Sequence, residues 1–148
     1  MLLLPDISHQ SLTMRSSNIL PCLALLIGPT VASFDSYATY STFYDNASQS
    51  TSALACSSWA NTAGYATLGE LPNFAFIGGK ENVTEEDCGT CYILEYQSRQ
   101  QYLLVIDTAS FGFNTSYIFL DALTSGSAKF LISVPVTATP VDPSNCGL

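Results

Sequence analysis

The sequence predicts a small, mainly β protein, folded as a barrel with one or two short helices and two disulfides. Short runs of β-forming residues alternate with Gly, Pro and Asn turn signals along most of its 148 residues. An even number of cysteines remains once an N-terminal leader is removed, as in small secreted proteins with a disulfide framework. Composition alone leaves barrel and sandwich open, and the small helices among many short strands favour the barrel.

The N-terminus is predicted to be a secretory signal peptide spanning residues 1–32. Arg15 supplies a basic start, residues 19–27 form an apolar run, and residues 30–32 are small. That run is about half of the roughly 20 residues that a membrane-spanning helix needs. Met14 directly precedes Arg15, so a start at Met14 is an alternative. A buried N-terminal helix is the other alternative, and the proline and glycine in this segment disfavour it.

Removal of the leader would leave residues 33–148 as one domain, without Cys22 and without His9, the single histidine of the chain. A chain without histidine excludes Ser-His-Asp and Cys-His catalysis and Cys₂His₂ zinc sites. We therefore expect no metal and no cofactor. The four remaining cysteines permit three pairings; they are Cys56, Cys88, Cys91 and Cys146.

The predicted domain is strongly acidic. Lys80, Arg99 and Lys129 stand against eleven carboxylates, a net charge of −8. Nucleic acid and anionic membrane surfaces would be repelled, so neither is an expected partner. Charged residues are nevertheless few, and Ser, Thr, Tyr and Asn are many. Most of the surface is therefore predicted to be uncharged, polar and aromatic, which suits sugars. A secreted β protein without a ligand is the plainer alternative.

Four strands are predicted from the β-forming and apolar runs. Residues 36–44 are rich in Tyr, Thr and Ser, and residues 91–96 begin at a cysteine. Residues 102–106 form a continuous apolar run, which indicates a strand buried on both faces. Residues 130–134 form another such run, and Pro135 predicts a bulge or a sheet edge just after it.

One helix is predicted over residues 116–124, with Asn114 as its N-terminal cap and Gly126 near its C-terminal end. The chain then closes with a last strand, and a disulfide from Cys146 would fix the C-terminus.

The motif Cys88-Gly89-Thr90-Cys91 permits three interpretations: a redox dithiol, half of a zinc site, or halves of two structural disulfides. A redox dithiol needs a thioredoxin-like βαβ setting, and zinc needs further reduced ligands. Neither is present in the sequence, so the motif is interpreted as structural.

Several fragments occur in the order of one family, cover nearly all of residues 37–148 and include all four cysteines. They are Tyr44-Asp45-Asn46, Cys56-Ser57, residues 71–79, residues 88–91, residues 107–109 with 112–114, Leu123-Thr124 and Cys146-Gly147-Leu148. Together they resemble the cerato-platanin family, small secreted proteins of filamentous fungi. The resemblance implies a six-stranded double-psi β-barrel, shared with the first domain of expansins, with barwin and with some endoglucanases. It also implies the disulfides Cys56–Cys88 and Cys91–Cys146.

In the related barrels, carboxylates corresponding to Asp45 and Asp107 line a polysaccharide groove. Two carboxylates across a groove are what inverting glycoside hydrolysis requires. A turn-capping role for each aspartate is the alternative, and we favour it. The family is considered to lack robust hydrolase activity, and this chain also departs from its pattern: Ser41 replaces an aspartate, Thr108 a histidine and Tyr92 a tryptophan.

Carbohydrate binding needs only aromatic rings that stack on sugar faces and polar groups that bond to hydroxyls. Trp59 is a further aromatic residue outside the expected cluster, and core burial of the tyrosines is the alternative. The expected carbohydrate-binding residues are Tyr40, Tyr44, Asp45, Asn46, Asp107 and Asn114.

Three sequons are present, at Asn46, Asn82 and Asn114. Asn82 and Asn46 are the expected glycosylation sites, because a glycan on Asn114 would compete with its predicted capping role.

The resulting expectation is a secreted, non-catalytic protein of the fungal cell wall. The resemblance implies binding to chitin-derived N-acetylglucosamine oligomers or another wall polysaccharide, expansin-like loosening, and elicitation of plant defence through a plant receptor. A weak hydrolase that uses Asp107 and Asp45, and a surface-active protein that self-assembles, are the alternatives.

Overall fold

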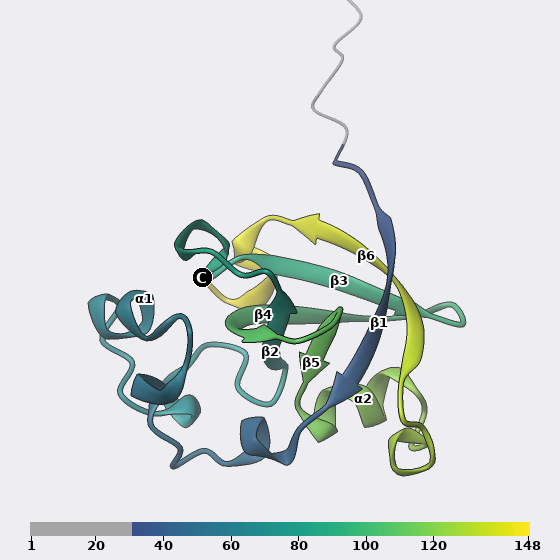
Figure 1. The fold of residues 1–148 in the computed structure, drawn as a ribbon, viewed down its shortest axis with the longest axis horizontal. Coiled ribbons are helices and arrows are strands. Elements are labelled where there is room, and N and C mark those ends of the chain that lie inside the picture. Colours follow the sequence, from purple (N-terminus) through teal and green to yellow (C-terminus); the bar gives the residue numbers. More distant parts are fainter. Residues whose placement is uncertain (1–30) are drawn as a thin grey trace, which may run out of the picture.

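The computed structural model describes residues 31–148, so residues 1–30 of the predicted leader and the alternative start at Met14 lie outside the described residues. Six strands close into a barrel in the order β1-β5-β2-β4-β3-β6 (Figure 1). The strands are β1 Phe34–Tyr40, β2 Ile77–Glu81, β3 Cys91–Tyr96, β4 Arg99–Ala109, β5 Phe113–Thr115 and β6 Val134–Val141. The predicted fold class is confirmed.

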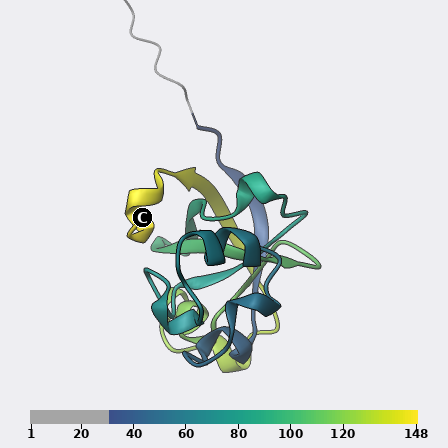
Figure 2. The ribbon, with the colours of Figure 1, turned by 90° about the vertical axis from the view of Figure 1, so that its left-hand side faces the viewer.

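Two short helices accompany the barrel, α1 Ser57–Thr62 and α2 Tyr117–Leu123. Figure 2 shows α1 in front of the barrel when it is seen from the side that lies on the left in Figure 1. No helix in residues 31–148 is long and apolar enough to cross a membrane.

The cap of α2 differs from the prediction. Ser116 is the N-cap, and its hydroxyl accepts a hydrogen bond from the Phe119 amide at 2.9 Å. The same hydroxyl donates to the Ala75 carbonyl. Asn114 was the wrong residue because β5 continues through Thr115, which leaves Asn114 inside a strand.

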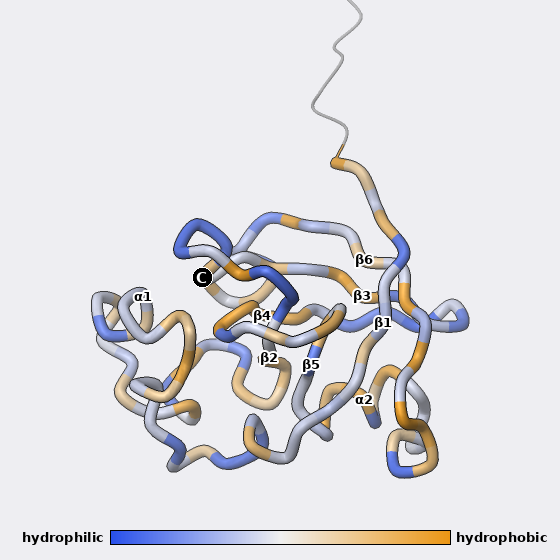
Figure 3. Tube along the Cα trace, in the orientation of Figure 1, coloured by the Kyte–Doolittle hydropathy of each residue, from blue (hydrophilic) through white to orange (hydrophobic). Residues whose placement is uncertain are grey.

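The barrel wall separates two hydrophobic clusters, and β4 contributes to both. Leu103 and Val105 point into the barrel, where α2 closes one end, whereas Leu104 and Ile106 pack outside it. The outer cluster lies beneath the segment of residues 41–76 and includes Tyr44, Leu54, Leu68 and Leu71. The prediction of a strand buried on both faces is confirmed for residues 103–106, whereas Tyr102 at the start of the predicted run is 40% exposed (Figure 3 shows β4 as hydrophobic only in part).

A bulge interrupts the parallel pairing of β2 with β4. Gly78 pairs with Val105 and Gly79 with Asp107, so Ile106 is an extra residue. An extra residue changes the face to which the following side chains point. Because Ile106 already packs in the outer cluster, the bulge turns Asp107 to the outer face as well.

The strand predicted over residues 36–44 ends early, at Tyr40. The Ser41 hydroxyl accepts a hydrogen bond from the Phe43 amide and starts the short 3₁₀ helix Thr42–Asp45. Tyr40 and Tyr44 consequently do not share one face of one strand.

The strand predicted over residues 130–134 was also wrong, since β6 begins only at Val134. Phe130 and Ile132 lie in the preceding loop with 76% and 94% of their surface exposed. Pro135 lies inside β6 opposite Tyr37, before the pairing of β6 with β3 begins at Thr137. Its missing N–H therefore falls where β6 has a partner on one side only.

Both disulfides implied by the resemblance are present, Cys56–Cys88 and Cys91–Cys146, with Cα atoms 5.5 and 5.8 Å apart. Gly89 lies between them with φ +79°, and an added Cβ would come within 2.7 Å of the Trp59 ring. Since β6 ends at Val141, the second disulfide holds the C-terminal 3₁₀ helix Pro143–Cys146 against the start of β3. The interpretation of the motif as structural is confirmed.

Candidate functional site

Four residues form a line across adjacent strands on the outer face of the barrel, and we call them the polar row. Thr39 of β1 pairs with Asn114 of β5, Asn114 with Gly79 of β2, and Gly79 with Asp107 of β4. Three interstrand spacings of about 4.8 Å separate Thr39 from Asp107 by about 14 Å along the curved wall, since β1 and β4 are three strands apart in the closed order. Their side chains face outward, because the neighbours of Asn114 in β5 are buried while Asn114 is half-buried.

Asp107 marks one end of the polar row, and both of its carboxylate oxygens are engaged. Oδ1 accepts hydrogen bonds from the backbone amides of Ala55 and Thr108, each at 2.8 Å. Oδ2 accepts one from the Tyr44 hydroxyl at 3.0 Å. Two of these donors belong to residues 41–76, so Asp107 ties that segment to β4.

Tyr44 is buried, with only 3% of its surface exposed, and packs in the outer hydrophobic cluster. Burial raises the pKa of its hydroxyl far above the ordinary value, and the charge of Asp107 and the hydrogen bond to it act in the same direction. Tyr44 therefore remains a protonated donor to Asp107 at physiological pH. Its ring is a core element, as the alternative interpretation of the tyrosines proposed.

Asp45 follows Tyr44 directly but turns toward α2. Its carboxylate accepts hydrogen bonds from the backbone amides of Tyr117 at 2.9 Å and Ile118 at 3.1 Å. These are free donors in the first turn of a helix, where negative charge is also stabilising. The capping interpretation thus describes the contacts of Asp45.

An aromatic pair lies beside this contact. Tyr40 at the end of β1 and Tyr117 at the start of α2 meet edge to face, with ring centroids 5.1 Å apart. Both rings are half-buried.

The six expected residues are thus brought together only in part. Tyr44 touches Asp107, and Asn114 shares the polar row with Asp107, whereas Asp45 and Tyr40 lie beside α2. The exposed Asn46 turns its side-chain oxygen to the Ser48 amide at 3.1 Å.

Three residues that the sequence interpretation missed complete this face: Thr39, whose hydroxyl donates to the Asn114 side chain at 3.3 Å, together with Gly79 and Tyr117. No local signal could identify Thr39 or Gly79, because their place in the row depends on pairing between distant strands. Tyr117 was detectable as an aromatic residue at a predicted helix start.

Trp59 and the sequons have distinct environments. Trp59 lies half-buried on α1, 6.0 Å from the ring of Tyr65. Asn82 and Asn46 are exposed, as the glycosylation prediction requires. Asn114 lies in β5, between β1 and β2, and this position, rather than a role as helix cap, is why we expect no glycan there.

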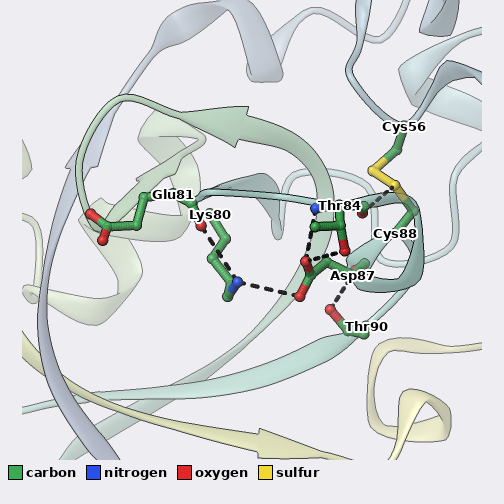
Figure 4. Close-up of polar contacts among 7 residues, drawn as sticks. All are labelled: Cys56, Lys80, Glu81, Thr84, Asp87, Cys88 and Thr90. Carbon is green, nitrogen blue, oxygen red and sulfur yellow. Dashed lines mark hydrogen bonds and ion pairs between the residues drawn. A yellow bond between two sulfur atoms is a disulfide. The ribbon is translucent and has the colours of Figure 1, made fainter.

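A separate polar cluster supports the disulfides (Figure 4). Lys80 and Asp87 form an ion pair at 3.3 Å. The other carboxylate oxygen of Asp87 accepts hydrogen bonds from the amide and hydroxyl of Thr84, at 2.8 and 2.9 Å. The bond from the Thr84 amide is the main cause that lowers the pKa of Asp87. The cluster closes the turn that leads into Cys88. Within residues 31–148, no group of three His, Cys, Asp or Glu side chains is arranged to hold a metal ion.

Comparison with known proteins gives one family. The family model described as Cerato-platanin matches residues 36–148. The heat-stable 19 kDa antigen of Coccidioides immitis is 38% identical over 116 residues, which cover 74% of this chain and 80% of that protein. Allergen Asp f 15 of Aspergillus fumigatus is 37% identical over 113 residues, covering 73% and 74%.

Solved structures agree with the sequence comparison. The crystal structure of cerato-platanin 3 from M. perniciosa superimposes with a TM-score of 0.73 at 36% identity, covering 78% of this chain and all of that one. The solution structure of the fungal elicitor Cerato-Platanin gives 0.64 at 27% identity, covering 74% and 95%.

Proposed function

Because the chain belongs to the cerato-platanin family, we propose that it is a secreted, non-catalytic fungal protein that binds cell-wall oligosaccharides and elicits plant defence. The observation that carries the binding proposal is the polar row, which places Thr39, Asn114 and Asp107 in one line around the outer wall. Amide, hydroxyl and carboxylate groups of this kind bond to sugar hydroxyls. The Tyr40–Tyr117 pair is the nearest candidate for ring stacking.

The contacts of the two aspartates argue against hydrolysis. An inverting glycosidase needs one carboxyl group to protonate the leaving oxygen and another to activate water. Asp107 accepts three hydrogen bonds and Asp45 accepts two from the first turn of α2. These bonds hold each carboxylate against the backbone and occupy lone pairs that the chemistry would need.

Secretion is supported by two disulfides in a domain of this size, which form and persist in oxidising compartments. The elicitor role rests on the similar structure that is described as a fungal elicitor. Infiltration of plant leaves with the folded protein tests it: a defence response to the folded protein, absent after reduction of the disulfides, is expected. No response at high dose would remove this part of the proposal.

Titration with N-acetylglucosamine oligomers followed by NMR tests the binding proposal. Shifts should cluster at Thr39, Asn114 and Asp107, and Asn114→Ala should weaken binding. Asn61→Ala is the matched control, since Asn61 is exposed on α1, outside the polar row. Shifts confined to residues outside the polar row would refute the proposal.

The hydrolase alternative has its own test. Reducing ends released from amorphous cellulose by the wild type, and abolished by Asp107→Asn, would establish it. We expect no release above background at high protein loading.

Expansin-like loosening is a separate proposal, which extension of wall strips under constant load would test. An unchanged extension rate would refute it.

A second function, assembly at interfaces, is favoured by one specific observation. Phe130 and Ile132 are almost fully exposed in the loop before β6, where such residues favour contact with an apolar phase. The double change Phe130→Ser and Ile132→Ser should abolish a concentration-dependent fall in surface tension. An unchanged fall would assign the activity to other residues.

A further inference from the structure

A second line of outward side chains crosses the opposite part of the barrel wall. Thr137 of β6 pairs with Asp35 of β1 on one side and with Glu95 of β3 on the other. All three are exposed. Two interstrand spacings of about 4.8 Å put the Cα atoms of the two acidic residues about 10 Å apart.

These residues border a surface hollow of about 590 Å³. We call it the tyrosine hollow. It is lined by Asp35, Ser36, Tyr37, Glu95, Tyr96, Gln97, Pro135, Val136 and Thr137.

Aromatic surface flanks the carboxylates. Tyr37 is 45% exposed and leans on Phe111, with ring centroids 5.4 Å apart. Tyr96 also lines the hollow, but its half-buried ring packs against the cluster inside the barrel. An exposed ring such as that of Tyr37 offers a flat face to the apolar side of a sugar or to a cation.

The charge of the tyrosine hollow is uncompensated. Its lining holds two carboxylates and no basic side chain. Asp35 accepts a hydrogen bond from the Thr137 hydroxyl at 3.3 Å, and Glu95 accepts one from the Gln100 amide at 2.6 Å. The nearest cation in the strand pairing is Arg99, opposite Tyr96. The one ion pair found within residues 31–148 is that of Lys80, so Arg99 forms an ion pair with neither carboxylate.

We propose that the tyrosine hollow binds a cationic amino sugar chain, a β-1,4-linked glucosamine oligomer such as deacetylated chitin. The Tyr37 ring would stack on a sugar face, and Asp35 and Glu95 would pair with ammonium groups on the chain. Thr137 and Gln97 offer partners for the ring hydroxyls.

The fold favours a sugar over a basic peptide as the occupant. Extended peptides commonly bind by adding a strand to a free sheet edge. β1, β6 and β3 are consecutive strands of a closed barrel, so this part of the wall has no free edge. The ligand must therefore be recognised by side chains alone, and those present are aromatic, hydroxyl, amide and carboxylate groups.

The tyrosine hollow and the polar row share no residue. The hollow is proposed to bind a cationic sugar and the row a neutral one, so the two proposals can fail separately. The test compares binding of glucosamine hexamer, N-acetylglucosamine hexamer and hexalysine by calorimetry and NMR. The variants are Asp35→Asn with Glu95→Gln, and Tyr37→Ala. The control is Glu85→Gln with Glu86→Gln, which removes the same two charges from the exposed 3₁₀ helix Glu85–Asp87.

Glucosamine hexamer should bind and shift the signals of Asp35, Tyr37 and Glu95. The double variant should lose about tenfold in affinity for each carboxylate removed, the typical effect of a charged hydrogen bond. Tyr37→Ala should also weaken binding, and the control should bind as the wild type does.

An equal loss of affinity in the control would mean that binding depends only on the overall negative charge. Tighter binding of hexalysine would identify a basic peptide as the ligand. Equal shifts in the tyrosine hollow with the acetylated hexamer would show that charge is not recognised. Each of these three results would overturn the proposal.

Discussion

Two pairs of carboxylates lie on the outer surface of this barrel, and they differ in the groups that donate hydrogen bonds to them. Asp45 and Asp107, which a sequence motif makes conspicuous, are bonded to backbone amides of distant segments. Asp35 and Glu95, which no motif marks, accept bonds only from neutral side chains of adjacent strands. The conspicuous pair is therefore structural in its contacts, and the inconspicuous pair is available to a ligand.

The difference follows from where residues 41–76 lie. This segment supplies no strand to the barrel, yet it covers the outer hydrophobic cluster. It needs attachments to the barrel wall, and Asp107, Asp45 and the disulfide of Cys56 provide three of them. The wall formed by β1, β6 and β3 carries no such segment at the tyrosine hollow, and its carboxylates remain exposed.

Removal of the disulfide Cys56–Cys88 breaks this comparison most strongly. The double change to serine releases the covalent attachment of the segment 41–76, and it opens a loop between two cysteines that are 32 positions apart. The chain-entropy model predicts a loss of roughly 3 to 4 kcal/mol in the free energy of unfolding. Urea unfolding of the variant and of Asp35→Asn as control measures it. A loss below about 1 kcal/mol would mean that the noncovalent contacts alone hold the segment.

Asp107→Asn tests the comparison directly. The variant keeps the side-chain shape but loses the charge that accepts three hydrogen bonds, one of them from the buried Tyr44. We expect it to lower the free energy of unfolding by about 2 kcal/mol. Asp35→Asn makes the same chemical change at an exposed position, where the effect should stay within about 0.5 kcal/mol. Equal effects in urea unfolding would erase the distinction between the two pairs.

Sequence patterns predicted the parts of the fold that rest on local chemistry. The apolar run of residues 102–106 and the strand starting at Cys91 are visible because many adjacent residues agree. β2 and β5 were missed because one contains Gly78-Gly79 and the other has three residues. They are strands because they have partners on both sides. Gly79 is required there: an added Cβ would lie 2.6 Å from the Thr108 carbonyl oxygen.

The candidate site, like the fold, was predictable only where a residue carries a local sequence signal. Asp107 could be recognised at the end of an apolar strand, and Asp45 in a turn. Its neighbours in the polar row could not, since Thr39 pairs with Asn114 in parallel across 75 positions of sequence. The apolar run at residues 130–134 failed for the opposite reason. Hydrophobicity alone predicted burial, whereas Phe130 and Ile132 are exposed.

Asp45→Asn sharpens the comparison at a smaller scale. The carboxylate satisfies two free amides at the start of α2 and adds negative charge near the positive end of the helix. Its amide replacement keeps one acceptor, so we expect a loss of about 1 kcal/mol. The signals of Tyr117 and Ile118 should show faster amide exchange. An unchanged stability and exchange rate would assign the cap to Ser116 alone.

Asp87→Asn should have the smallest effect on stability. Asp87 is a third kind of carboxylate, because it is bonded to Thr84 of its own turn and to Lys80. The pKa of Asp87 is lowered in the folded chain, chiefly by the Thr84 amide. A lowered folded pKa adds stability that is complete above the unfolded pKa of about 3.9 and disappears as pH falls through the folded pKa. The stability gap between wild type and Asp87→Asn should therefore be constant at neutral pH and shrink below about pH 4. Urea unfolding across this range measures the gap. A gap that stays constant into strong acid would mean that the ionised carboxylate adds nothing to the turn, and that the turn is held by the disulfide of Cys88 instead.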